Sequence, residues 1–194
     1  MSAREKILNA IAANQPEQVP LPVIDMNVLI SYKDVCMQFN TMLESIGGQV
    51  ELIQDIQVLK EKLNADKTTG KFVINTIREL GEVDGYVISL SALQLEKLER
   101  AYVKGTVGVA ENGAVWIYES RMLNRLVPFI CQHLVLVIHK KDIVATMHHA
   151  YEKIDVVQEG FGVFIAGPSK TADIEQSLVI GAHGARSAIV YIIE

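Results

Sequence analysis

The sequence predicts an α/β fold with a mixed, mostly parallel β-sheet, preceded by a helical arm at the N-terminus. Short apolar runs typical of buried strands recur along the chain, and stretches with helical periodicity separate most of them. This alternation is the pattern of parallel βαβ units. An Asn-Gly pair between two apolar runs adds an antiparallel hairpin, so the sheet is expected to be mixed.

Residues 1–30 are expected to form an arm, and residues 31–194 an α/β domain. In the arm, Ile7 and Ile11 share one face of a helix predicted over 3–13. The prolines that follow this helix exclude regular structure, so they predict a linker: Pro16, Pro20 and Pro22.

The domain is expected to begin with a helix over 32–46, with Ser31 and Asp34 as its cap and Gly47-Gly48 at its end. The remaining predicted elements, in chain order, are a strand at 50–53, a helix spanning 56–63, strands at 72–74 and 86–88, a helix over 93–101, a hairpin of 106–109 with 114–117, a strand at 134–138, a helix over 142–154, a strand at 161–166, a helix containing 174–179 and a last strand at 188–193.

Composition limits the class of protein. With 194 residues, of which 49% are hydrophobic, one domain with a well-buried sheet is expected. The net charge of -5 gives a nucleic-acid function no electrostatic basis. No apolar run is long enough to span a bilayer, and the first residues are charged and amphipathic rather than a signal peptide. A cytoplasmic location is therefore expected.

The two cysteines, Cys36 and Cys131, are expected to be reduced, buried thiols, because both lie in apolar surroundings far apart in the sequence. No Cys-x-x-Cys motif occurs, so an intrinsic iron–sulfur cluster is not expected. The adjacent His148 and His149 point about 100° apart on a helix and cannot both face one metal. No metal site is expected.

The most informative stretch follows the strand predicted at 161–166. A strand that turns through Gly-Pro into a hydroxyl-rich helix start is where open α/β sheets usually build ligand sites, because free backbone N–H groups there attract anions. The alternative is that Thr171 or Asp173 caps the helix, and that the two carboxylates of its first turn satisfy the helix dipole. Both interpretations stay open. The candidate ligand-binding residues are Gly167, Ser169, Lys170, Thr171, Asp173 and Glu175.

A second candidate follows closely, in Gly181-Ala182-His183-Gly184. Glycines on both sides of His183 suggest a tight loop at the entrance of the last strand. The imidazole could bind an anion or transfer a proton near neutral pH. The alternative is a histidine that only bonds backbone groups at a helix end.

These motifs resemble those of the LUD-domain family, to which lactate utilization protein C belongs. The family typically ends with Gly-Pro-Ser-x-Thr-Ala-Asp-Ile-Glu and then Gly-x-His-Gly before the last strand, as at 167–175 and 181–184 here. It also carries an Ala-Glu-x-Gly turn, present at 110–113, where Asn112 replaces the usual Thr. The strong match covers roughly the second half of the chain. The resemblance implies a three-layer NagB/RpiA/CoA transferase-like fold, as in sugar-phosphate isomerases and CoA transferases.

The turn at 110–113 holds the candidate catalytic residue, Glu111. In CoA transferases of the similar fold, a Glu in a Glu-Asn-Gly turn attacks the acyl-CoA, and a carboxylate nucleophile splits one hard acyl transfer into easier steps. The alternative is that Asn112 and Gly113 form a type I′ hairpin turn, with Glu111 merely preceding it. Gly113 is also a candidate ligand-binding residue.

Arg125 is the last candidate for ligand binding. With Arg121, four residues earlier, it could hold a carboxylate, since guanidinium matches that geometry. Asn124-Arg125-Leu126 also resembles a stretch of the LUD-domain family. The alternative is a solvated pair of arginines near Glu119.

For function, the resemblance implies an accessory protein or subunit in the oxidation of L-lactate to pyruvate, beside iron–sulfur oxidoreductase partners. No intrinsic cofactor is expected, and CoA or a phosphorylated molecule is the candidate ligand. Two alternatives stay open: a CoA transferase or thioesterase that uses Glu111, and a regulator that binds an organic acid or a phosphorylated metabolite. A homo-oligomer is also an open alternative.

Overall fold

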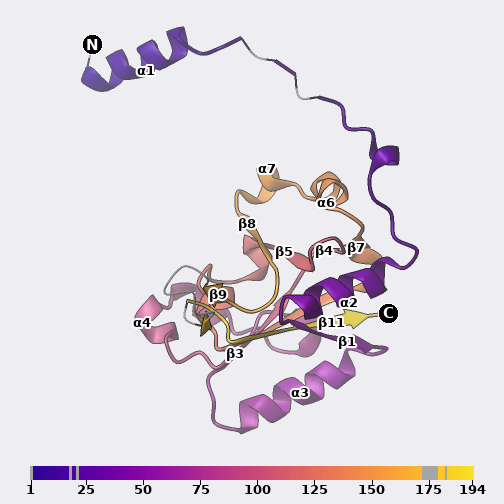
Figure 1. Cartoon of the computed structure of the whole chain (residues 1–194). Coiled ribbons are helices and arrows are strands. Elements are labelled where there is room, and N and C mark those ends of the chain that lie inside the picture. Colours follow the sequence, from indigo (N-terminus) through magenta and orange to yellow (C-terminus); the bar gives the residue numbers. More distant parts are fainter. Residues whose placement is uncertain (1, 18, 21, 172–178, 182) are drawn as a thin grey trace.

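The computed structural model describes residues 2–17, 19–20, 22–171, 179–181 and 183–194. In Figure 1 two sheets and their covering helices lie together, and the N-terminal helix stands apart at the end of an extended segment. None of the helices in these ranges is long and apolar enough to cross a membrane.

The N-terminal helix α1 (Ala3–Ala13) begins with a capping box, which confirms the helix predicted over 3–13. The backbone N–H of Glu5 donates to Ser2 Oγ at 3.2 Å, and the backbone N–H of Ser2 donates to Glu5 Oε2 at 2.6 Å. No residue of α1 is buried. The helix is therefore held by its own bonds and not by packing against the domain.

The main sheet has five parallel strands in the order β1-β11-β6-β3-β2. β6 lies at its centre, and Leu136 on β6 stands opposite Val190 on one side and Val103 on the other. The strands are β1 (Gln49–Ile53), β2 (Val73–Asn75), β3 (Arg100–Lys104), β6 (His133–His139) and β11 (Ser187–Ile193).

The central strands of the main sheet are buried on both faces, whereas the edge strand β1 is largely exposed. Successive side chains of a strand point to opposite faces. On β6, Leu134, Leu136 and Ile138 belong to the core that also contains buried side chains of α2 (Val35–Ser45). Val135 and Val137 face the other way, into the core beneath α3 (Gln57–Thr68). Figure 1 shows α2 and α3 on opposite sides of the sheet.

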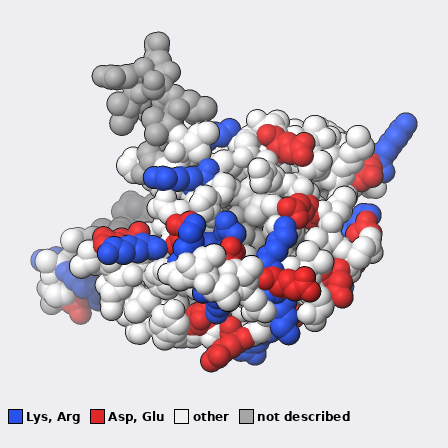
Figure 2. All heavy atoms as spheres, turned by 90° about the horizontal axis from the view of Figure 1, so that it is seen from below, with Lys and Arg blue, Asp and Glu red and all other residues white. Residues whose placement is uncertain are grey.

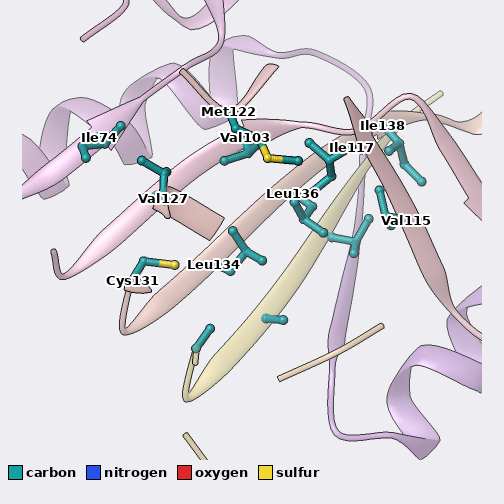
Figure 3. Close-up of a cluster of buried hydrophobic side chains, with 14 of the residues drawn as sticks. Ile74, Val103, Val115, Ile117, Met122, Val127, Cys131, Leu134, Leu136 and Ile138 are labelled. Carbon is teal, nitrogen blue, oxygen red and sulfur yellow. The ribbon is translucent and has the colours of Figure 1, made fainter. Parts of the chain in front are cut away.

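A second, smaller sheet covers the same face as α2. Its strands run in the order β7-β4-β5-β8, antiparallel except for the β4–β7 pair. Figure 3 shows Val115 and Ile117 of β5 close to the β6 side chains of the main core. The strands are β4 (Val107–Val109), β5 (Ala114–Tyr118), β7 (Ile143–Val144) and β8 (Gly162–Ile165).

The two sheets correct the prediction of one mixed sheet. Alternate β5 side chains point to opposite sides: Val115 packs on the main core, whereas Trp116 packs on Phe164 of β8 with ring centroids 4.7 Å apart. β8 thus pairs with one edge of β5, and the parallel sheet packs on one face of β5. Gly105 lies where the sheets meet, since a Cβ there would come within 2.4 Å of Val115 Cγ1 and 2.6 Å of Ile138 Cγ2.

Three predicted elements between residues 86 and 154 differ from the structure. The strand predicted at 86–88 is a 3-10 turn, η3 (Gly85–Ser89), in which only Val87 is buried. The helix predicted over 93–101 divides into α4 (Ala92–Leu95) and the strand β3, because residues from Arg100 pair with the open edge of β6. The helix predicted over 142–154 begins only at α6 (Met147–Lys153), since the β-branched residues before it pair with β4 as β7.

The hairpin of β4 and β5 is confirmed, but its turn is not the predicted two-residue type I′ turn. Val109 pairs with Ala114, so residues 110–113 form a four-residue loop. The backbone N–H of Gly113 donates to Val109 O at 2.9 Å, and Asn112 Oδ1 accepts from the backbone N–H of Ala114 at 3.0 Å. Gly113 has a φ of 69°, whereas Asn112 is not in the left-handed region that type I′ requires of both residues.

After β8 the chain forms a two-stranded pair, β9 (Lys170–Thr171) with β10 (Val179–Ile180). Thr171 and Val179 therefore lie in strands and not in the helix that the sequence predicted. The rest of that predicted helix, with Asp173 and Glu175, lies outside the described residues. The other short elements are η1 (Met26–Val28), η2 (Arg78–Leu80), η4 (Glu119–Arg121), α5 (Val127–Ile130), η5 (Lys140–Asp142) and α7 (Val156–Glu159).

Opposite charges are interspersed on the face that carries α3, which Figure 2 shows from below the view of Figure 1. Three ion pairs there join α3 to its surroundings. They are Lys62 with Glu51 at 3.0 Å, Lys67 with Asp84 at 3.1 Å and Arg100 with Asp66 at 2.8 Å.

Replacing Leu136 by Ala is expected to lower the free energy of unfolding by about 2–5 kcal/mol, because its side chain is 1% exposed at the centre of the sheet. Urea unfolding monitored by circular dichroism measures this loss. Leu93→Ala is the control: that side chain is 75% exposed, so its effect should stay within about 0.5 kcal/mol. Equal losses in the two variants would contradict the packing described.

The thiol of Cys131 is expected to be unreactive in the native protein. Burial raises its pKa to about 12, and the thiolate is the reacting form. In a Cys36→Ser background, Ellman's reagent at about pH 8 should label Cys131 only after urea is added. Rapid labelling without urea would show that Cys131 is not buried as described.

Candidate functional site

The chain segments before and after the β9–β10 pair line one cavity of about 310 Å³. One wall is the turn after β8, and the other is the chain just before β11. Four of the ligand-binding residues predicted from the sequence line this cavity: Gly167, Ser169, Lys170 and His183. The structure therefore brings together two motifs that are separate in the sequence.

Backbone bonds hold the two walls against each other. The backbone N–H of Ser169 donates to Ala185 O at 2.8 Å, and that of Gly181 donates to Ser169 O at 2.9 Å. A Cβ on Gly184 would come within 2.9 Å of Ser169 Cβ, so only glycine permits this approach. The close contact places the exposed His183 beside the half-buried Ser169.

The turn at Gly167 rests on the end of α2. Gly167 has a φ of 71°, and a Cβ there would lie 3.2 Å from Ile46 O. Lys170 extends to the same place, because its Nζ would lie 3.6 Å from a Cβ on Gly47. A cation beside the carbonyl oxygens of a helix C-terminus is stabilised by the helix dipole. Lys170 thus has a structural contact as well as a place in the cavity wall.

The cavity lies at the amino ends of β6 and β11, where Leu134 and Ala185 contribute to its wall. This differs from the position expected from the sequence, since open α/β sheets bind ligands at the carboxyl ends of their strands. The position differs because β8, the strand before the turn, belongs to the second sheet and not to the parallel sheet. Ligand binding by these residues stays a prediction.

Glu111 and Gly113 do not line this cavity. Glu111 Oε1 accepts a hydrogen bond from the backbone N–H of Met147 at 3.1 Å, at the first turn of α6. The carboxylate therefore satisfies a backbone donor that the helix itself leaves unpaired. Gly113 packs on α2, because a Cβ there would come within 2.8 Å of Leu43 N. These contacts fasten the hairpin loop to two helices.

Arg125 also lies outside the cavity wall. Its Nε and Nη2 donate to the two carboxylate oxygens of Glu119 at 2.6 Å and 2.8 Å. The guanidinium carbon lies 4.7 Å from the centre of the Phe161 ring. The hydrogen bonds from Arg125 hold the pKa of Glu119 below its usual range. This exposed ion pair between Arg125 and Glu119 agrees with the alternative interpretation, in which Arg125 is solvated and lies near Glu119.

A polar cluster on the α3 face was missed by the sequence analysis. His133 Nδ1 lies 2.7 Å from Ser187 Oγ, and the hydroxyl of Tyr102 donates to Asp66 Oδ2 at 2.5 Å. Burial, and secondly the charge of Arg100, hold the pKa of His133 below its usual value. These residues come from distant elements that only the sheet order brings together, so the sequence carries no local signal for the cluster.

Within the part of the chain that the structure describes, no group of three His, Cys, Asp or Glu side chains is placed to hold a metal ion.

Comparison with known proteins identifies one family and one similar fold. The LUD domain matches residues 94–193. Lactate utilization protein C of Shouchella clausii is 34% identical over 93 residues, which is 45% of this chain and 41% of that protein. The protein of the same name from Bacillus subtilis is 33% identical over 99 residues, covering 46% and 41% of the two chains.

The relative from Geobacillus thermodenitrificans is 30% identical over 115 residues, or 54% of this chain and 48% of that one. The aligned stretch thus spans about half the length, or less, of the curated relatives. A crystal structure of a DUF162 family protein from Deinococcus radiodurans has a TM-score of 0.61 and 15% identity. It covers 86% of this chain and is itself covered completely. At this identity the likeness shows the fold alone.

Replacing Glu111 by Ala is expected to lower the free energy of unfolding by about 1 kcal/mol, since the first turn of α6 loses an acceptor. Glu111→Gln keeps an oxygen that can accept from Met147 and should lose less. Chemical denaturation of both variants gives the comparison. If Ala at position 111 left stability unchanged, the structural role of this carboxylate would be refuted.

Proposed function

Because the chain belongs to the LUD-domain family, we propose that it is an accessory protein or subunit in the oxidation of L-lactate to pyruvate. The observation that carries this proposal is the match of residues 94–193 to the LUD domain, together with relatives named lactate utilization protein C. The stretch contains both walls of the cavity at Ser169 and His183.

Oxidising lactate to pyruvate removes two electrons and two protons, and the electrons need an acceptor. Iron–sulfur clusters are usually held by several cysteine thiolates. This sequence has two cysteines, and Cys131 is buried with its thiol pKa raised. We place the electron-carrying centres on iron–sulfur partner proteins, and we assign to this chain the binding or positioning of a small molecule.

The cavity beside β11 suits a small carboxylate. Ser169 offers a hydroxyl, Lys170 an ammonium group and His183 an imidazole at its wall. Hydrogen bonds from charged donors to a carboxylate are the stronger kind. The acyl-CoA alternative gains no such support, since the Glu111 carboxylate is already bonded to the backbone of Met147.

Growth on L-lactate as the sole carbon source tests the proposal. A deletion strain is expected to lose this growth, and the wild-type gene should restore it. A gene carrying Ser169→Ala and His183→Ala should restore it poorly, whereas His148→Ala, an exposed histidine outside the cavity, should restore it fully. Tagged protein from lactate-grown cells should retain an iron-containing partner. Normal growth of the deletion strain together with no iron-containing partner would refute the role.

A further inference from the structure

A second cavity lies at the opposite edge of the main sheet, at the carboxyl ends of β2 and β3. Its volume is about 430 Å³. Thr76 follows the last residue of β2, and Lys104 is the last residue of β3. The backbone N–H of Thr76 donates to Tyr102 O at 3.0 Å, which fixes this corner to the sheet. Open α/β sheets bind ligands at such an edge.

Positive charge dominates the wall of this cavity. Arg78, Lys104 and Arg121 line it, against the single carboxylate of Glu79. Lys104 is paired with Glu79. Among the described residues, neither Arg78 nor Arg121 takes part in an ion pair with a carboxylate, and both side chains are exposed. Both guanidinium groups are therefore accessible to an anion from solution, and the Glu79 carboxylate lies within range of the Arg121 charge.

The same wall holds a polar atom without a partner. Thr76 Oγ1 is buried and makes no hydrogen bond within the described part of the chain. A buried hydroxyl without a partner destabilises the fold, so a ligand that accepts a hydrogen bond from it would remove this cost. Leu123, also in the wall, has a φ of 62°. An apolar residue in the left-handed region is strained, and such strain gathers at binding sites.

A neighbouring cavity of about 290 Å³ continues along the same edge over β6 and β11. The two cavities share Ile77, Glu79 and Lys104. The wall of the second is largely apolar, with Ile56 and Ile193 among its residues. It also holds the carboxylate of Asp55, which would repel an anion. The charged part of a ligand is therefore directed to the arginine end.

We propose that this edge is a binding site for an organic phosphate whose phosphate group lies between Arg78 and Arg121, and that the Thr76 side chain turns from its buried position to donate a hydrogen bond to that phosphate. Guanidinium groups match phosphate oxygens two at a time, and two of them balance the charge of one phosphate better than that of one carboxylate. The apolar body of the ligand lies over Ile77 and Ile193. This site is separate from the cavity at Ser169 and does not depend on the lactate role.

Backbone-amide NMR during titration with phenyl phosphate tests the proposal, because this probe joins a phosphate to an apolar ring. The amides of residues 76–79 and 120–123 should shift, and phenyl phosphate should bind more tightly than inorganic phosphate. Benzoate, with the same ring on a carboxylate, should bind more weakly than phenyl phosphate.

Three variants separate binding from folding. The double variant Arg78→Gln, Arg121→Gln should weaken phenyl phosphate binding by roughly tenfold or more. Thr76→Val should weaken it while leaving the melting temperature unchanged or higher, because a buried hydroxyl without a partner is removed. Arg4→Gln on the exposed helix α1 makes the same kind of charge change and should leave binding unaltered.

Any one of four results would overturn the site. One is no amide shift with phenyl phosphate at about 10 mM. Another is benzoate binding as tightly as phenyl phosphate. The third is unchanged affinity in the double variant. The fourth is amide shifts confined to residues 167–170 of the other cavity.

Discussion

Strand β6 pairs with β11 along its whole length, from His133 opposite Ser187 to His139 opposite Ile193, and the rest of the structure depends on this ladder. Every side chain from Leu134 to Ile138 is buried. The backbone groups between them are shielded from water, so their hydrogen bonds must come from the neighbouring strands β11 and β3. Each buried face of β6 must pack against other elements. Helix α3 packs on one face, and α2 with the second sheet packs on the other.

Parallel pairing also separates the two cavities. All five strands of the main sheet point the same way, so their amino ends meet at one edge and their carboxyl ends at the other. The cavity at Ser169 and His183 lies at the amino edge. The cavity with Arg78 and Arg121 lies at the carboxyl edge. The five-stranded sheet lies between them, so the two proposed ligand sites stand at opposite ends of its strands.

Local patterns in the sequence predicted much of the fold. The apolar runs at 134–138 and 188–193 are strands, and the helix over 3–13 forms because its cap is local. The division into two sheets was not predictable, since β8 pairs with β5 through contacts distant in the sequence. The α/β class followed from the alternation of apolar runs with helical stretches, and the family followed from motifs. Arg78 and Thr76 belong to no such motif. Thr76 and Arg78 follow β2 of the main sheet, whereas Arg121 follows β5 of the second sheet, so their proximity arises only from the packing of the two sheets.

Native-state hydrogen exchange measures the central claim most directly. If the β6–β11 ladder is the last structure to open, the amides of 134–138 and 188–192 should exchange only through global unfolding, at the free energy given by denaturant titration. Amides of the hairpin β4–β5 and of α1 should exchange at lower free energies. Faster exchange in β6 and β11 than in the hairpin would contradict the account, because the second sheet would then be the more stable part of the fold.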